Sequence, residues 1–209
     1  PRRHVPRRSL PMEPMQTEER RLTVERNVPV DALYMAFHMC SRNHPDYYAF
    51  DMLSDLLSSG RSSRFVQHLV QDKQIFNSID AYISGSIDNG LFHIVGKPAP
   101  EKTLEEAEKA IWEELALLTE GSIDENELEK VKNRYESEQI FNNLNYLNVA
   151  TNLAYFELIG KAEDINTEVE KYRSVTQEQI KRAAKQTFLP ENCSVLYYKA
   201  AAKGASHTP

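Results

Sequence analysis

The chain of 209 residues has little cysteine, no excess of positive charge and no long apolar run. Its two cysteines, Cys40 and Cys193, are too few for the disulfide framework of a small secreted scaffold. A formal net charge of -6 argues against a general nucleic-acid binder, because phosphate affinity comes mainly from clustered Lys and Arg. No apolar stretch is long enough to span a bilayer. We therefore expect a soluble protein with no membrane span and no nucleic-acid partner.

The chain also lacks the common catalytic motifs. It has no His-x-x-Glu-His in either orientation, no Gly-x-Ser-x-Gly and no Walker loop. Asp51 and Asp55 lie one helical turn apart, which is more typical of a solvated helix face than of paired catalytic acids. His38, Cys40 and His44 lie within seven residues and could bind a small metal ion, but His38 and Cys40 sit in an apolar segment where both are common core residues. Motifs alone therefore identify no active site and no resident metal.

The first residues, "PRRHVPRRSLPMEP", are too rich in Pro and Arg to fold alone and lack the apolar core of a signal peptide. We predict an interdomain linker over residues 1–18, a domain over residues 19–200 and a flexible tail over residues 201–209. Because the chain begins at Pro without an initiator Met, we expect a fragment or a processed product.

The apolar periodicity predicts the elements of the domain. "RRLTVERNV" alternates, with Leu22 and Val24 on one face, and residues 32–40 are apolar on both faces, as in a central strand. Helical spacing follows over residues 50–57 and 62–72. Residues 75–87 then alternate, and a turn at residues 88–90 leads into a second strand of a hairpin.

The remaining part of the chain is mainly helical. Thr103 with Glu106, and Thr176 with Gln179, have capping-box spacing, and Gly121 marks a helix end. Residues 124–158 read as one helical region with a break in the Asn-rich middle, because Asn competes for backbone hydrogen bonds. "CSVLYY" reads as a last strand. The predicted class is α+β, a mostly antiparallel sheet with helices packed on one face.

The segment "LSSGRSSRFVQHLVQDKQIF" raises the question of a phosphate cradle. Gly60 follows a helix instead of a strand and no Lys accompanies it, so we interpret it as the end of one helix and Ser62 as the start of the next. Phe65 and Leu69 are predicted core residues. Arg64 is predicted to be solvated or paired with a carboxylate.

Several of these segments together resemble a known family. "EPMQTEERRLTVERNVPVDALYMAFHM", "HPDYYAFDMLSDLLSSGRSSRFVQHLVQDKQI", "GLFHIVGKPAP" and "GSIDENELEKVKNR" are similar to the carboxy-terminal half of pitrilysin or insulinase zinc metallopeptidases, in the processing-peptidase-like bacterial branch. The resemblance covers residues 13–199. It implies two similar α+β halves that close around an extended peptide, with zinc bound only by the other half on a His-x-x-Glu-His motif.

The resemblance also directs attention to particular positions. The zinc-motif positions of the other half correspond to Asp51, Ser54 and Asp55, which form no family zinc site and are expected to be surface acids with a Ser between them. An Arg and a Tyr that many second halves direct at the bound peptide correspond to Val70 and Asn77, and both are departures.

Candidate contacts with a peptide in the chamber are Gln74, Asn77 and Tyr82, and no residue is assigned a catalytic or metal-binding role.

We therefore expect an inactive, peptidase-like domain that completes a peptide-binding chamber. Its expected partners are a peptide substrate and the catalytic half, in the same chain or in a partner subunit. Zinc is expected in that other half, and no cofactor in this domain. The expected location is the bacterial cytoplasm or periplasm. The alternative is a non-catalytic binding or assembly subunit of a heteromeric complex, as in core subunits of respiratory complexes.

Overall fold

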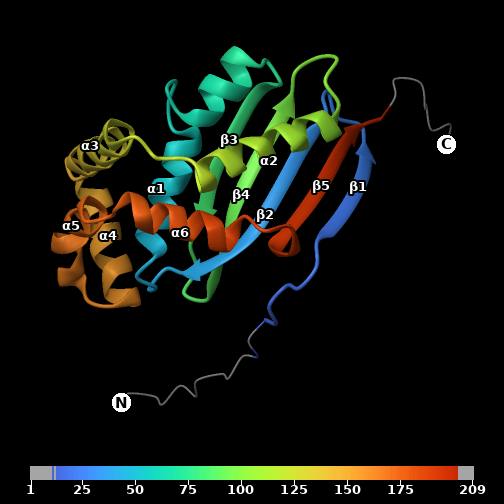
Figure 1. The fold of residues 1–209 in the computed structure, drawn as a ribbon. Helices are drawn as coiled ribbons and strands as arrows, with labels where there is room; N and C mark the ends of the chain where they lie inside the picture. The colour runs from blue at the N-terminus through green and yellow to red at the C-terminus, as the bar shows by residue number, and fades with distance from the viewer. Residues whose placement is uncertain (1–10, 12, 202–209) are drawn as a thin grey trace.

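The computed structural model describes residue 11 and residues 13–201. At its centre is a five-stranded sheet with the strand order β1-β5-β2-β4-β3 (Figure 1). The pair β1–β5 is parallel and the other three pairs are antiparallel, which confirms the predicted mostly antiparallel sheet. The strands are β1 (Arg20–Arg26), β2 (Ala32–Ser41), β3 (Phe76–Ser84), β4 (Asn89–Pro98) and β5 (Cys193–Ala200).

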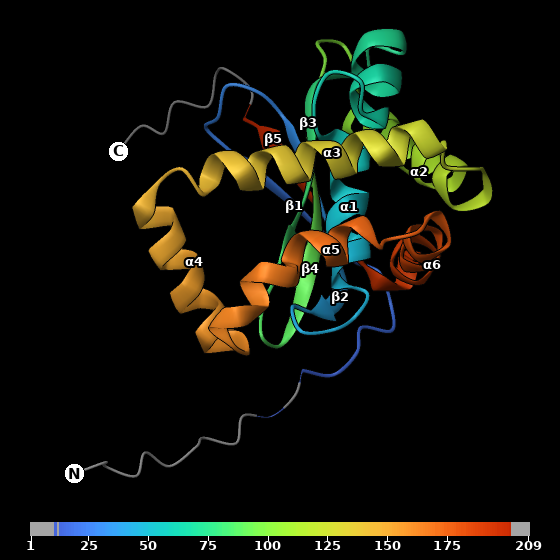
Figure 2. The ribbon, with the colours of Figure 1, turned by 90° about the vertical axis from the view of Figure 1, so that its left-hand side faces the viewer.

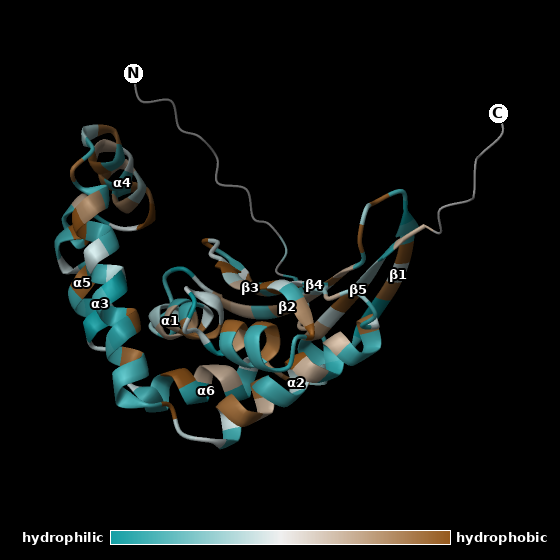
Figure 3. Cartoon of the chain, turned by 90° about the horizontal axis from the view of Figure 1, so that it is seen from above, coloured by the Kyte–Doolittle hydropathy of each residue, from teal (hydrophilic) through white to brown (hydrophobic). Residues whose placement is uncertain are grey.

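Helices cover one face of this sheet. Figure 3 shows α1, α2 and α6 below the sheet, and no helix of the described residues lies over its upper face. The helices of the described residues are α1 (Tyr47–Ser58), the π-helix η1 (Phe65–Asp72), α2 (Leu104–Glu120), α3 (Glu125–Asn142), α4 (Tyr146–Ile159), the 3-10 helix η2 (Ala162–Thr167), α5 (Glu168–Arg173), α6 (Gln177–Thr187) and the short η3 (Pro190–Asn192). No helix among these residues is both long and apolar enough to cross a membrane.

The core forms between the sheet and these helices. Alternate residues of β2, namely Leu33, Met35 and Phe37, are buried on the covered face. The apolar stripe of α1, with Leu53 and Leu57, packs into the same cluster. The apolar residues that repeat every second position in the strands therefore pack against those that repeat every 3.6 positions in the helices.

The predicted capping boxes and the end of α1 are confirmed, but the second helix begins at Phe65 and not at Ser62, with Arg64 as its N-cap. The side chains of Thr103 and Glu106 form a capping box at the start of α2, and Thr176 and Gln179 form another at the start of α6. Gly60 has a φ of 88°, in the left-handed region that favours glycine, just after α1. The predicted break in the Asn-rich segment lies between α3 and α4.

Two local details differ from the sequence pattern, whereas the predicted central position of β2 is confirmed. Leu22 lies on the face of β1 that no described helix covers, so it remains 61% exposed. The hairpin turn precedes Asn89, which already belongs to β4, so Ile87 lies in the turn and is exposed instead of sharing the face of Ile79.

The predicted linker and tail lie largely outside the described residues. Within the described part of the linker, Gln16 is buried, and its side-chain amide donates a hydrogen bond of 2.8 Å to the carbonyl of Cys193. The ordered packing therefore begins slightly before residue 19.

Candidate functional site

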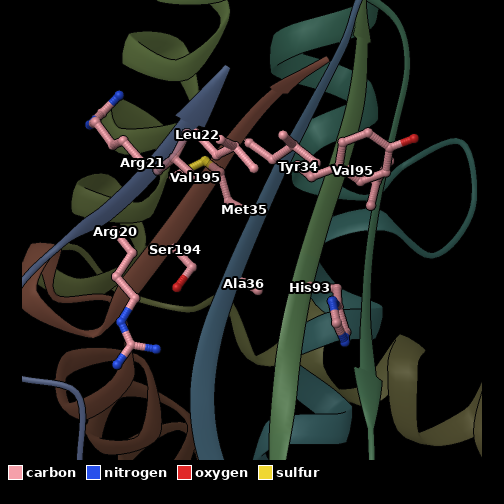
Figure 4. Close-up of a pocket in the computed structure, with 11 residues that line it drawn as sticks. Arg20, Arg21, Leu22, Tyr34, Met35, Ala36, His93, Val95, Ser194 and Val195 are labelled. Carbon is pink, nitrogen blue, oxygen red and sulfur yellow. The ribbon is translucent and has the colours of Figure 1, made fainter. Parts of the chain in front are cut away.

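The uncovered face of the sheet, called the open face below, carries a hollow of about 330 Å³. β1, β5, β2 and β4 contribute to its lining. One row of cross-strand neighbours runs Leu22, Leu196, Tyr34 and Val95, and the next runs Arg20, Ser194, Ala36, His93 and Tyr82. Figure 4 shows Tyr34 and Val95 beside Leu22 in this hollow, with His93 further along β4.

Aromatic rings dominate the exposed part of this face. The rings of Tyr34 and Tyr198 meet edge to face, with centroids 6.4 Å apart. Tyr82 stacks on His93 at 4.9 Å, and the Oγ of Ser84 lies 2.7 Å from the Nε2 of His93. Burial lowers the pKa of His93, so its imidazole is neutral at neutral pH. Neutral aromatic and aliphatic side chains suit apolar contacts with a ligand better than acid–base chemistry.

Arg21, on the other face of β1, is paired with two carboxylates. Arg21 lies between the carboxylates of Glu19 and Glu108, and these two partners raise its pKa. The hydroxyl of Tyr197 donates a hydrogen bond of 2.6 Å to Glu108. These contacts tie the edge strand β1 to α2 on the covered side of the sheet, whereas Arg20 is the neighbouring charged residue that lines the hollow.

Of the three candidate peptide contacts, Tyr82 alone lies on the open face. It is 48% exposed and belongs to β3. Gln74 lies in the turn before β3 with a φ of 50°. Asn77 is exposed at an irregularity of the strand, where the pairing skips from Phe76 to Ser78. Since a strand rises about 3.3 Å per residue, Tyr82 is roughly 16 Å from Asn77, and the three do not form one cluster.

The residues at the positions of the family zinc motif are not surface acids, as the sequence led us to expect. They are partly or fully buried and form hydrogen bonds within the domain. Asp51 and Asp55 are both half-buried. The hydroxyl of Tyr172 donates to the carboxylate of Asp51, and the ring of Tyr172 stacks on Tyr135. Ser54 is buried and donates to the carbonyl of Asp51 at 2.8 Å.

Burial determines the protonation of this cluster. It raises the pKa of Asp51, against the opposing effect of the hydrogen bond from Tyr172. Burial, followed by the charge of Asp51, raises the pKa of Asp55 to about 6. One serine and two carboxylates whose pKa values are raised do not fit zinc, which prefers deprotonated His, Cys and carboxylate ligands.

His38, Cys40 and His44 do not assemble into a metal centre. In the described part of the chain, no group of three potential ligands among His, Cys, Asp and Glu could hold a metal ion. Burial raises the pKa of the Cys40 thiol to about 11, which favours the protonated thiol. The Nδ1 of His44 accepts a hydrogen bond from the backbone N–H of Asp46 at 3.1 Å.

The remaining expectations concern η1. Phe65 and Leu69 are buried, as predicted. Arg64 pairs with Glu127 at 2.8 Å, which confirms the carboxylate partner. Val70, at the position of the family Arg, is half-buried in the same helix.

Apart from Tyr82, no pattern in the sequence marks the open face as a site. Residues 32–40 are apolar on both faces, which is typical of a strand that is buried on both sides. The alternate positions Tyr34, Ala36 and His38 instead lie on the open face.

Comparisons with known proteins agree with this fold and with the absence of the zinc motif from the sequence. Residues 2–135 match the family described as "Peptidase M16 inactive domain". YmxG of Bacillus subtilis, described as an uncharacterized zinc protease, is 25% identical over 170 residues, or 80% of this chain and 41% of its own.

Two solved structures are similar in fold. A protease from Helicobacter pylori has a TM-score of 0.87 at 22% identity, covering 95% of this chain and 48% of its own. The inactive peptidase domain of a putative zinc protease from Bordetella parapertussis has a TM-score of 0.72 at 17% identity, covering 80% of this chain and 91% of its own. The chain thus spans less than half the length of YmxG and of the Helicobacter protein. It belongs to the family of Peptidase M16 inactive domains.

Proposed function

We propose that this domain completes the peptide chamber of a zinc metallopeptidase, with the open face directed at the peptide. The parent protein would hydrolyse peptide bonds, and a separate half with a His-x-x-Glu-His motif would bind the zinc. The observation that carries the proposal is the apolar, aromatic hollow on the face of the sheet that no helix of this domain covers. A concave apolar surface of this kind suits the side chains of an extended polypeptide.

Several features favour a non-catalytic role for this domain. The domain belongs to an inactive-domain family, and Tyr172 engages Asp51 where the other half would bind zinc. The family Arg and Tyr positions hold Val70 and Asn77. What the domain offers is therefore a surface, and Tyr82, Tyr34 and Leu196 are the side chains we assign to peptide contact, ahead of Gln74 and Asn77.

The test has two parts. Calorimetric titration of this chain with zinc, and a peptide-hydrolysis assay on the same sample, should give neither stoichiometric binding nor activity. Addition of the half with the zinc motif should produce activity, and Leu196→Glu should reduce kcat/KM at least tenfold by placing a charge in the hollow.

The control is Leu117→Glu, on α2 and 58% exposed, which should keep wild-type activity. Tight one-to-one zinc binding by this chain alone, or equal activity of Leu196→Glu and wild type, contradicts the proposal.

A further inference from the structure

A second apolar surface lies at the turn where α3 ends and α4 begins. We call it the elbow surface, and its exposed large apolar side chains are Ile140, Phe141, Leu144, Tyr146 and Leu147. Tyr146 is 91% exposed and Leu147 is 72% exposed. Single exposed apolar residues are ordinary, but five of them within eight residues of the chain point to an interaction site.

The helix α4 reinforces this conclusion. Its apolar residues are distributed around the whole helix, yet Phe156 is its only buried residue, and it packs mainly against η2. A helix with apolar residues all round is normally enclosed by protein or membrane. The described part of the chain provides no such cover for α4, so its cover must come from another molecule or another part of the protein.

The composition of the elbow surface favours a protein partner over a membrane. Glu157 is the only charged residue between positions 140 and 158, and this stretch contains no Lys or Arg. Helices that lie on membranes usually carry Lys and Arg beside their apolar side. The apolar residues are instead interspersed with five asparagines, and aromatic residues with few charges are typical of the centre of a protein interface.

Polar contacts fix α4 and α5, and with them the elbow surface, to the rest of the domain. Arg42 is 8% exposed and pairs with Glu168 at 2.5 Å, and the hydroxyl of Tyr48 donates to the same carboxylate at 3.1 Å. The side-chain amide of Asn43 donates to the carbonyl of Ile159 at 3.3 Å. These contacts join the end of β2 and the start of α1 to α5 and the end of α4.

The position of α4 indicates which partner covers it. Figure 3 shows α4 standing beyond the level of the sheet on its open side, and Figure 2 shows it connected to α3 and, through η2, to α5. A single body seated on the open face therefore reaches the elbow surface as well. YmxG and the Helicobacter protease have more than half of their length outside the part that matches this chain, which is enough for such a body.

We infer that the elbow surface is a docking surface for the zinc-carrying half of the peptidase, which contacts α4 while it faces the open face. This inference rests on the proposed function and adds the surface through which the two halves hold together. The elbow surface is an interaction site and not a peptide-binding site, so its loss affects association of the halves before it affects chemistry.

The experiment compares binding and activity with the halves produced as separate chains. Wild-type domain should bind the zinc-motif half in calorimetry, and Leu147→Glu and Leu144→Glu should each weaken the affinity at least tenfold. Leu147 lies in the first turn of α4, where a negative charge favours the helix, so the variant should fold. Leu117→Glu, on the opposite side of the sheet, is the matched control and should bind as wild type does.

Activity at saturating domain separates this inference from the proposed function. An elbow variant should regain full activity when its concentration is raised, whereas Leu196→Glu should not. If the elbow variants bind as well as wild type while Leu196→Glu loses activity, the elbow inference is wrong and the proposed function stands. If the wild-type domain neither binds nor activates the zinc-motif half, both are wrong.

Two further results would assign the elbow surface to a partner other than the zinc-carrying half. Light scattering that shows a dimer of this chain, broken by Leu147→Glu, would assign the surface to a second copy. Co-sedimentation with vesicles of phosphatidylcholine and phosphatidylglycerol, abolished by the same change, would assign it to a lipid surface. Either result overturns docking of the zinc-carrying half.

Discussion

The two faces of the sheet have the same strands but different environments. On β2, Met35 and Phe37 lie under the helices and are almost fully buried, while Tyr34 and Ala36 alternate with them on the open face. Both sets are apolar. The covered face therefore supplies the stability of the isolated domain, and the open face retains apolar area that becomes useful only when something binds it.

The largest expected effect tests the covered face. Phe37→Ala should lower the free energy of unfolding by about 3–5 kcal/mol, because Phe37 is fully buried and its ring meets Trp112 and Phe188 edge to face. Urea denaturation measures this loss. Tyr34→Ala, on the other face of the same strand, should cost less than about 1 kcal/mol. Equal losses would remove the distinction between the faces.

A second prediction concerns the side of α1 turned away from the sheet. Asp55 has a pKa of about 6 in the folded protein, above its ordinary value of 3.8. Between these values the folded state keeps a proton that the unfolded chain has lost, so the free energy of unfolding falls as the pH rises from about 4 to 6. One pKa unit corresponds to about 1.4 kcal/mol, which limits this contribution to about 3 kcal/mol.

Asp55→Asn should flatten this decline, as measured by urea denaturation at several pH values between 4 and 7. Asp88→Asn, in the exposed turn between β3 and β4, serves as the control for loss of one charge and should keep the wild-type slope. If the free energy of unfolding depends on pH equally in Asp55→Asn and wild type, burial of the Asp55 carboxyl does not account for the decline.

A third prediction tests whether the covering helices also contribute through their ends. Thr103→Ala removes the hydrogen bond that the backbone N–H of Glu106 donates to the Thr103 hydroxyl, and it should cost about 1 kcal/mol. Thr119→Ala, near the other end of α2, should cost less. A thermal melt of both variants makes the comparison, and a larger loss for Thr119→Ala would contradict the capping role.

The smallest effect on stability is expected at the edge of the open face. Leu22→Ser should change the free energy of unfolding by no more than about 0.5 kcal/mol, because the side chain is mostly exposed. The same substitution should weaken binding of the zinc-motif half or of peptide, because it removes apolar area from the hollow. If Leu22→Ser lowers the free energy of unfolding strongly and leaves binding unchanged, the open face contributes to stability and not to binding.

Local sequence was sufficient for most of the elements. The two capping boxes, the left-handed Gly60 and the break between α3 and α4 depend on side chains and backbone within a few residues, so they could be predicted. The same holds for the core roles of Phe65 and Leu69. The missing zinc motif could also be read directly from residue types.

The tertiary structure alone decided which surfaces remain uncovered. Periodicity determines which side chains share a face but not what packs on that face, so Tyr34 cannot be distinguished by pattern from the core residues of β2. The contact between Asp51 and Tyr172 joins residues 121 positions apart, and no local sequence pattern predicts it. The parallel pairing of β1 with β5 likewise joins the two ends of the described domain, because the sheet brings together segments that are distant in the chain.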